Sequence, residues 1–192
     1  MSIAERQPSK SIDMGHKGSF APTGTITVGP SATGRGRPVE PGDVIRLDLG
    51  STVDGYTSDS ARTVVFGKPS QDVYDVYTAL YDAFHVGLDL LRPGIALNLI
   101  YYAAMQAMHD RGYGMYSRGH FGHSVGASLF VEEWPFIAAD HETVIEPDMV
   151  LAYELPLYIR GLGAFTLEDQ FAVSTHSVEA CWSLPRGLIV QN

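Results

Sequence analysis

The chain has 192 residues, of which 45 % are apolar, and 22 acidic residues outweigh 13 basic ones to give a formal net charge of −9. This length and composition predict one globular domain with a single good core. The negative balance, without a dense basic cluster, argues against nucleic-acid binding, and the sequence lacks the run of about 18 or more apolar residues that a transmembrane helix needs.

The cellular compartment is predicted from the start of the chain and from its cysteine content. Residues 1–6 are polar and lack the apolar core of a signal peptide. Cys181 is the single cysteine, so an internal disulfide cannot form, which agrees with a reducing compartment. We therefore expect a cytoplasmic protein that does not bind membranes.

The N-terminal part of the chain carries few signals of regular structure. Residues 1–20 are rich in Ser, Lys, Gly and Met without periodicity, so we expect them to be poorly ordered and residues 21–192 to form the domain. A short strand is predicted over residues 24–29. The Gly-Arg-Gly-Arg-Pro run at residues 34–38 is typical of a flexible connection.

Asp48 and Asp59 stand in two apolar segments separated by a turn signal. Residues 44–49 and 56–66 form the segments, and residues 52–55, Thr-Val-Asp-Gly, predict a hairpin between them. A four-residue loop would pair Ser51 with Tyr56. Counting outward from that pair places Asp48 directly opposite Asp59 on one face.

Two helices are predicted between this hairpin and the next. Apolar residues recur at helical spacing from Val73 to Leu91, after a start signal at Ser70 and before the Arg-Pro-Gly stop at residues 92–94. A second helix is expected from about Leu97 to His109.

A second hairpin repeats the arrangement of acidic residues. Glu154 and Glu168 stand in apolar segments on either side of residues 160–163, Arg-Gly-Leu-Gly. Centring the turn on Gly161 places Glu154 opposite Glu168. His123 lies before this hairpin, between Gly122 and Gly126.

Carboxylates that face each other on apolar strands repel and lose solvation, so a counter-charge is required. Two divalent cations would supply it. The alternative is that these residues are surface acids paired with Arg46, Arg62 or Arg160, but two mirrored acid pairs and a glycine-flanked histidine favour a metal site. The candidate ligands are Asp48, Asp59, His123, Glu154 and Glu168.

These motifs resemble those of the pita-bread metallopeptidase family, which includes methionine aminopeptidases, Xaa-Pro aminopeptidases and prolidases. The similar segments are GDVIRLDLG at 42–50, DGYTSDSART at 54–63, GHSVG at 122–126, EPDMVLAYE at 146–154 and LED at 167–169. The resemblance implies an α+β fold in which a curved, mostly antiparallel sheet carries helices on its outer face. The N-terminal half of that fold would be truncated here, so we expect a homo-oligomer or a partner chain that covers the exposed sheet.

The resemblance also implies a dinuclear site of Mn, Co, Fe or Zn with a bridging hydroxide. Asp48 would bind one ion, His123 and Glu154 the other, and Asp59 and Glu168 both. Hard oxygen donors with one imidazole favour Mn. Glu154 would serve as proton shuttle.

The sequence departs from the family pattern around the substrate. The expected substrate-binding histidines are missing, and His120 is the candidate catalytic replacement. Thr166 stands where the peptidases often have Arg. Glu132 and Trp134, with Tyr56, are the candidate substrate-binding residues, and an acidic entrance with an aromatic ring would suit a free α-amine.

Three hypotheses for function follow. The first is a metal-dependent exopeptidase or dipeptidase of the Xaa-Pro type that acts on short peptides. The second is a metal-dependent amidohydrolase that cleaves a non-peptide C–N bond, as in the creatinase branch. The third is a catalytically silent, truncated binding module.

Overall fold

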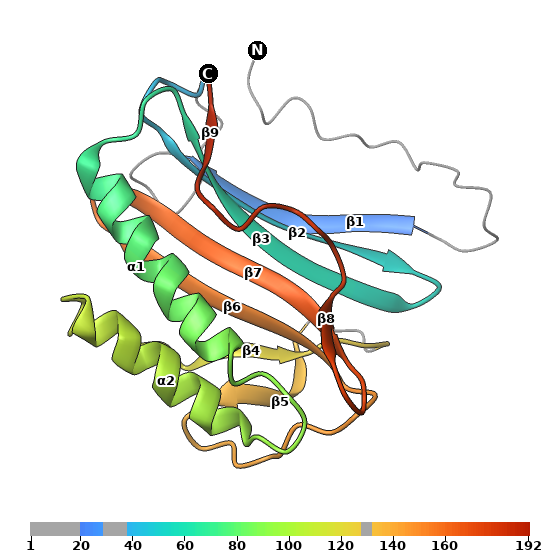
Figure 1. Cartoon of the computed structure of the whole chain (residues 1–192). Helices are drawn as coiled ribbons and strands as arrows, with labels where there is room; N and C mark the ends of the chain where they lie inside the picture. The colour runs from blue at the N-terminus through green and yellow to red at the C-terminus, as the bar shows by residue number, and fades with distance from the viewer. Residues whose placement is uncertain (1–19, 29–37, 128–131) are drawn as a thin grey trace.

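The strands form one sheet in which the two hairpins lie side by side. The computed structural model describes residues 20–28, 38–127 and 132–192, and Figure 1 shows their arrangement. The sheet order is β1-β2-β3-β7-β6-β4-β5, with β8 on β7 and β9 on β3, and β9 alone runs parallel to its neighbour in this part of the chain. The elements are β1 Phe20–Val28, β2 Val44–Val53, β3 Tyr56–Phe66, α1 Gln71–Leu88, α2 Leu97–Asp110, β4 His120–Ser124, β5 Glu133–Ala138, β6 Val150–Ile159, β7 Gly163–Val173, β8 Val178–Ala180 and β9 Ile189–Gln191.

The strand predicted over residues 24–29 is confirmed in the main, although β1 begins earlier, at Phe20. The expectations for residues 1–19 and 34–37 fall on parts of the chain outside the described residues.

Both predicted helices are confirmed, and both lie on the same face of the sheet (Figure 1). The Ser70 hydroxyl accepts a hydrogen bond from the Val73 amide at 3.3 Å, which caps the start of α1. The apolar stripe of α1 packs on β6 and β7, where the rings of Phe84 and Tyr153 stack with centroids 4.6 Å apart. Neither helix in the described part of the chain has the length and apolarity needed to cross a bilayer.

The hydroxyl of Tyr153 is buried under α1 without a hydrogen-bond partner among the described residues. A Cβ atom placed on Gly87 would lie 1.9 Å from this oxygen, so the glycine makes room for the ring. Because a buried hydroxyl without a partner retains its desolvation cost, Tyr153→Phe is expected to raise the free energy of unfolding by about 1 kcal/mol. Urea denaturation measures the change.

Tyr116→Phe is the matched control for that substitution. The Tyr116 hydroxyl donates to the Pro156 carbonyl at 3.0 Å, so its removal is expected to destabilise the fold by about 1 kcal/mol. Equal losses of stability in the two variants would contradict the difference in hydrogen bonding between the Tyr153 and Tyr116 hydroxyls.

The first hairpin turns more tightly than predicted. Val53 lies opposite Tyr56, so the loop is the dipeptide Asp54-Gly55, whose φ angles of 52° and 89° are those of a two-residue turn. The predicted direct pairing of the two aspartates is therefore wrong: Asp48 lies opposite Ala61, and Asp59 lies opposite Gly50. The error is an even number of residues, so both aspartates still share one face.

The second hairpin has the predicted register. Ile159 pairs with Gly163, residues 160–162 form the loop, and Glu154 lies directly opposite Glu168.

The two halves of the sheet meet where β3 lies beside β7, a junction that we call the β3–β7 seam. The described register of this seam contains one residue pair, Ala61 with Glu168. Side chains provide further contacts: the Thr63 hydroxyl donates to the Thr166 carbonyl at 3.0 Å and accepts from the Thr166 amide at 2.9 Å. Arg62 donates to the Glu168 carbonyl at 2.6 Å. Side-chain hydrogen bonds therefore supplement the backbone pairing at the seam.

The helices lie over β5, β6 and β7, whereas β1, β2 and β3 extend beyond them in Figure 1. On the helix side of this half, Ile45, Leu47 and Val64 line a hollow of about 420 Å³. Leu49, on the same side of β2, is 46 % exposed. This agrees with the expected apolar surface on the N-terminal half of the sheet.

Candidate metal centre

The five predicted ligands lie on the face of the sheet opposite the helices, which we call the inner face. Asp48 comes from β2, Asp59 from β3, His123 from β4, Glu154 from β6 and Glu168 from β7. We refer to these five residues as the acid cluster. Its members come from both sides of the β3–β7 seam.

Three members of the acid cluster are already within coordinating range of one another. Asp59, His123 and Glu168 each offer one ligand atom, and these atoms lie within 4.8 Å of each other. The separation between His123 Nε2 and Asp59 Oδ2 is 3.6 Å. The strand register places the other two members beside this group. Glu154 lies opposite Glu168 on the next strand. Asp48 lies opposite Ala61, which itself pairs with Glu168.

The imidazole of His123 is oriented for coordination through Nε2. Its Nδ1 lies 3.0 Å from the Ser124 carbonyl oxygen, which can only accept, so Nδ1 carries the proton. The unprotonated Nε2 then faces Asp59. A histidine whose second nitrogen donates to a carbonyl is the usual arrangement for a metal ligand. His123 is 1 % exposed, so this orientation is held by packing.

The carboxyl groups are buried, and both burial and the neighbouring carboxylates disfavour their ionised form. Glu168 is 2 % exposed and Glu154 is 8 % exposed, which excludes the surface-acid alternative for both. Burial, followed by the charge of Asp48, raises the pKa of Asp59 and that of Glu154 to about 7. Burial and then Glu154 raise the pKa of Glu168 well above its ordinary value. Several buried acids and one imidazole therefore form a donor set that divalent cations fit.

These raised pKa values make the stability of the metal-free protein depend on pH. The folded state retains protons that the unfolded state loses between the ordinary carboxyl pKa, about 4, and the raised values, about 7. The contribution of these groups is complete below pH 4 and is lost as the pH rises through 7. In the presence of a chelator, the free energy of unfolding is expected to fall by about 1.4 kcal/mol per pH unit for each retained proton.

Urea denaturation at pH 5 and pH 7 tests this dependence, with Asp59→Asn as the informative variant. Asp59→Asn removes one titrating group, so the free energy of unfolding should fall less steeply with pH in this variant. Asp54→Asn, at the exposed tip of the first hairpin, should leave the pH dependence unchanged. A wild-type slope that is also seen in Asp59→Asn would contradict the assignment.

Arg46 is a site residue whose position follows from strand alternation. It stands two residues before Asp48 on β2, so its side chain is on the inner face. The guanidinium contacts the Asp48 carboxylate, and its Nε donates to the Thr166 hydroxyl at 2.6 Å. The alternative in which an arginine pairs with an acid of the cluster therefore holds for Asp48. Arg62 instead pairs with Asp169 at 2.5 Å, away from the cluster.

His120 borders the acid cluster at the level of Glu154. Its Nδ1 lies 3.9 Å from Glu154 Oε1 and accepts from the Gly122 amide at 3.4 Å, which leaves the proton on Nε2. Burial lowers the pKa of His120, so the ring is neutral near neutral pH. Its Nε2 lies 3.7 Å from Glu132 Oε2. The structure thus brings His120 and Glu132 together beside Glu154.

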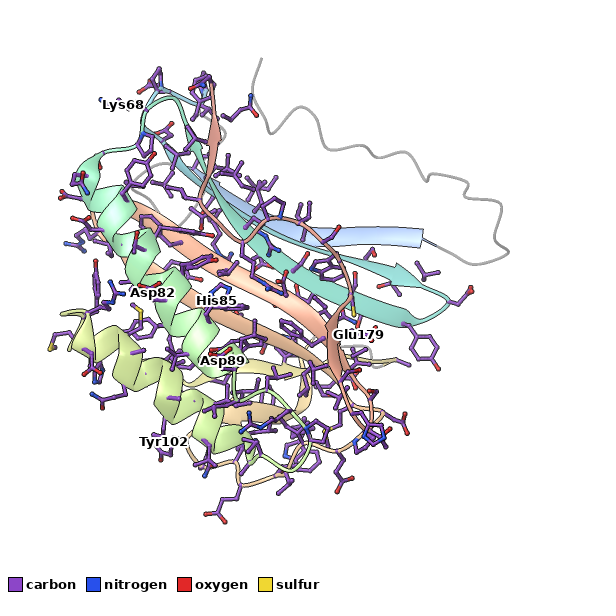
Figure 2. All side chains as sticks on the ribbon, in the orientation of Figure 1. Lys68, Asp82, His85, Asp89, Tyr102 and Glu179 are labelled. Atoms are coloured by element: carbon purple, nitrogen blue, oxygen red, sulfur yellow. The ribbon has the colours of Figure 1, made fainter. Side chains whose placement is uncertain are left out.

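The other two predicted substrate residues lie further out. Trp134 is 67 % exposed on β5, two residues before Phe136, which pairs with His123. Tyr56 is also 67 % exposed, but it stands at the hairpin tip and alternates onto the face opposite Asp59. The structure therefore does not bring Tyr56 to the cluster. His85, labelled in Figure 2, lies on α1 with Nδ1 2.7 Å from the Tyr81 carbonyl oxygen, which agrees with a structural role.

The chain that carries the acid cluster matches a known protein family. The model of metallopeptidase family M24 matches residues 9–175. The chain belongs to metallopeptidase family M24. The predicted membership of the pita-bread family is thereby confirmed, as is its α+β fold with a mostly antiparallel sheet and helices on one face.

Several relatives of this M24 chain are peptidases by name. It is 30 % identical to the Xaa-Pro dipeptidase of Pyrococcus horikoshii over 160 residues, which cover 83 % of this chain and 45 % of that protein. It is 33 % identical to the Xaa-Pro dipeptidase of Lactobacillus delbrueckii subsp. lactis over 131 residues, 68 % of this chain and 35 % of the relative. The chain therefore spans less than half the length of these curated relatives.

Solved structures agree with this similarity. The dipeptidase PepE from Mycobacterium ulcerans superposes with a TM-score of 0.82 at 31 % identity, covering 90 % of this chain and 47 % of PepE. The prolidase from Pyrococcus horikoshii gives a TM-score of 0.80 at 29 % identity over 86 % of this chain and 49 % of the prolidase.

Proposed function

We propose that this M24 chain is a metal-dependent dipeptidase that cleaves short Xaa-Pro peptides at a dinuclear centre formed by the acid cluster. The observation that carries the proposal is the convergence of four carboxylates and one imidazole on a single face. The names of the relatives support the choice of substrate. We also propose that residues 21–192 form the catalytic unit.

In this proposal Asp48, Asp59, His123, Glu154 and Glu168 hold two divalent ions. Manganese is the preferred ion because the donors are carboxylate oxygens with a single imidazole. Co, Fe or Zn are the alternative ions. When bound, the ions would lower the pKa of a shared water and polarise the scissile carbonyl. The chain supplies a dry setting for this chemistry, since Glu168 and His123 are almost fully buried.

Glu154 and His120 are the proposed acid–base residues. Glu154 is buried, and its Oε1 lies 3.9 Å from His120 Nδ1, so this carboxylate would accept and return a proton beside the reacting carbonyl. The neutral ring of His120 has Nδ1 beside Glu154 and its protonated Nε2 on the side of Glu132, from which the Nε2 proton would be donated to the substrate carbonyl. Glu132 and Trp134 would receive the α-amine, by charge and by stacking respectively.

The test of the proposed function combines metal content with hydrolysis of Ala-Pro. The purified chain is expected to bind close to two Mn²⁺ ions and to cleave Ala-Pro only in their presence. His123→Ala should lose both properties. His176→Ala, in an exposed turn, should keep them. Two bound ions with cleavage of a non-peptide amide but not of Ala-Pro would favour the amidohydrolase alternative, and absence of metal binding would favour the silent module.

We also propose that the apolar surface on the helix side of β2 and β3 is covered in solution by a second copy of the chain or by a partner chain. The exposure of Leu49 and the hollow beside Ile45 support this proposal. Light scattering of the purified chain is expected to give a dimer or a larger species. A stable monomer would contradict self-association.

A further inference from the structure

The guanidinium group of Arg186, in the segment between β8 and β9, is fixed on the helix side of the sheet. Its Nε donates to Asp169 Oδ2 at 2.5 Å. Its central carbon lies 5.8 Å from the centroid of the Phe84 ring on α1 and 5.6 Å from that of Phe171 on β7. Within the described part of the chain, its two Nη atoms make no hydrogen bond. The group is therefore held in place with unused donors.

Arg186 lines a hollow of about 380 Å³ on this side of the molecule, where the end of α1 faces β8 (Figure 1). Leu88 and Phe171 contribute apolar walls. Arg92 contributes a second guanidinium, whose Nη1 donates to the Asp89 carbonyl at 3.2 Å. Its other donors make no hydrogen bond to the described residues. Neither Asp89 nor any other acidic residue lines the hollow in the part of the chain that the structure describes.

Positive charge around this hollow exceeds negative charge. Asp169 is 1 % exposed and pairs with two guanidiniums, those of Arg62 and Arg186, at 2.5 Å each. One carboxylate cannot neutralise both groups, so one positive charge remains in excess. Arg92 adds another at the wall of the hollow. Because a partly buried cation without a full counter-charge is unfavourable, the hollow favours an anionic ligand.

The charge and the walls of the hollow indicate which anion fits. A phosphate monoester carries a charge of about −1.5 to −2 near pH 7 and three acceptor oxygens, which matches the two excess positive charges. Guanidinium groups pair with phosphate oxygens through two parallel hydrogen bonds. The apolar walls would contact the organic part of the ester. The volume of the hollow suits a small ligand of this kind.

We propose that Arg92 and Arg186 form a binding site for a small organic phosphate ester in the hollow between the end of α1 and β8. Both guanidiniums would donate to the phosphate oxygens, and the organic group would lie against Leu88 and Phe171. The site lies on the helix side of the sheet, opposite the acid cluster, and does not depend on the proposed function.

The test measures the binding of phenyl phosphate and of inorganic phosphate to the metal-free protein by calorimetry. Phenyl phosphate is expected to bind with a Kd below about 1 mM and at least about fivefold more tightly than inorganic phosphate. Arg92→Gln should weaken its binding at least about tenfold. Arg111→Gln is the matched control, because Arg111 also follows a helix but pairs with Asp82 at the surface, and it should bind as the wild type does. Glu168→Gln, which alters the acid cluster on the other face, should also bind normally.

Equal affinity for phenyl phosphate in wild type and in Arg92→Gln would overturn the site, as would the absence of binding by the wild type. Loss of binding in Glu168→Gln would place the ligand at the acid cluster and would also overturn it. Inorganic phosphate bound as tightly as phenyl phosphate would contradict the proposed organic ligand. None of these results depends on Mn²⁺ binding or on the cleavage of Ala-Pro, so the proposed function is tested separately.

Discussion

Glu168→Gln is expected to lower the Mn²⁺-dependent hydrolysis of Ala-Pro by more than about a hundredfold. Even a residue that only supports a metal ligand typically contributes ten- to a hundredfold, and Glu168 is a proposed ligand of both ions. The amide retains the size of the side chain but removes the charge that faces Glu154 across the hairpin. Asp59→Asn should have a similar effect, because Asp59 offers a ligand atom to the same group of three, with His123 and Glu168.

Stability distinguishes loss of the site from loss of the fold. Without metal, Glu168 is a buried acid with a strongly raised pKa, so its replacement by a neutral amide should leave the metal-free protein at least as stable at pH 8. Stabilisation by added Mn²⁺ should be reduced in the same variant. Glu142→Gln, at an exposed position, is the control. Normal turnover in Glu168→Gln would refute the proposed site.

Gly122→Ala is expected to destabilise the protein by about 3 kcal/mol or more. The φ angle of Gly122 is +142°, and a Cβ atom there would lie 2.1 Å from the carbonyl oxygen of Ala152. The clashing atom is backbone, so the strand must move. Gly122 precedes His123 on β4 and pairs with Tyr153 on β6, so displacement would also draw His123 away from Asp59.

Gly119→Ala serves as the comparison, because a Cβ atom at Gly119 would meet no other atom within 4 Å. Thermal unfolding and Mn²⁺ calorimetry on both variants measure the effects on fold and site. Only Gly122→Ala should lose stability and metal affinity together. Wild-type stability in Gly122→Ala would show that β4 and β6 can separate without cost.

Local sequence patterns predicted the elements that depend on local physics. The helices followed from their apolar spacing and from Ser70, and the second hairpin followed from a glycine-rich loop that fits one register. The first hairpin was predicted with the wrong loop length, although the Asp54-Gly55 dipeptide is the usual signal for a two-residue turn. The aspartates stayed on one face because the side-chain period of a strand is two.

The residues around the acid cluster were harder to predict because their partners are distant in sequence. Arg46 was considered only as a surface counter-ion, yet it bonds to Thr166, 120 positions away. Alternation from Asp48 would have placed it on the inner face. Arg118 has no comparable signal, since its contact with the Tyr158 ring depends on how the segment before β4 packs on β6. Tyr56 was predicted to bind substrate, but strand alternation places it on the face opposite Asp59.

The β3–β7 seam divides the sheet between two consecutive parts of the chain. Strands β1 to β3 come before the connection at residues 67–70, and β4 to β9 come after it, with β9 returning to pair with β3. Asp48 and Asp59 belong to the first part, and the remaining members of the acid cluster belong to the second. Ions bound by both would link two pieces whose strand pairing otherwise consists of the Ala61–Glu168 pair and the short pairing of β9 with β3. A chain cut at this connection would then form a split protein whose fragments reassemble in response to the metal concentration.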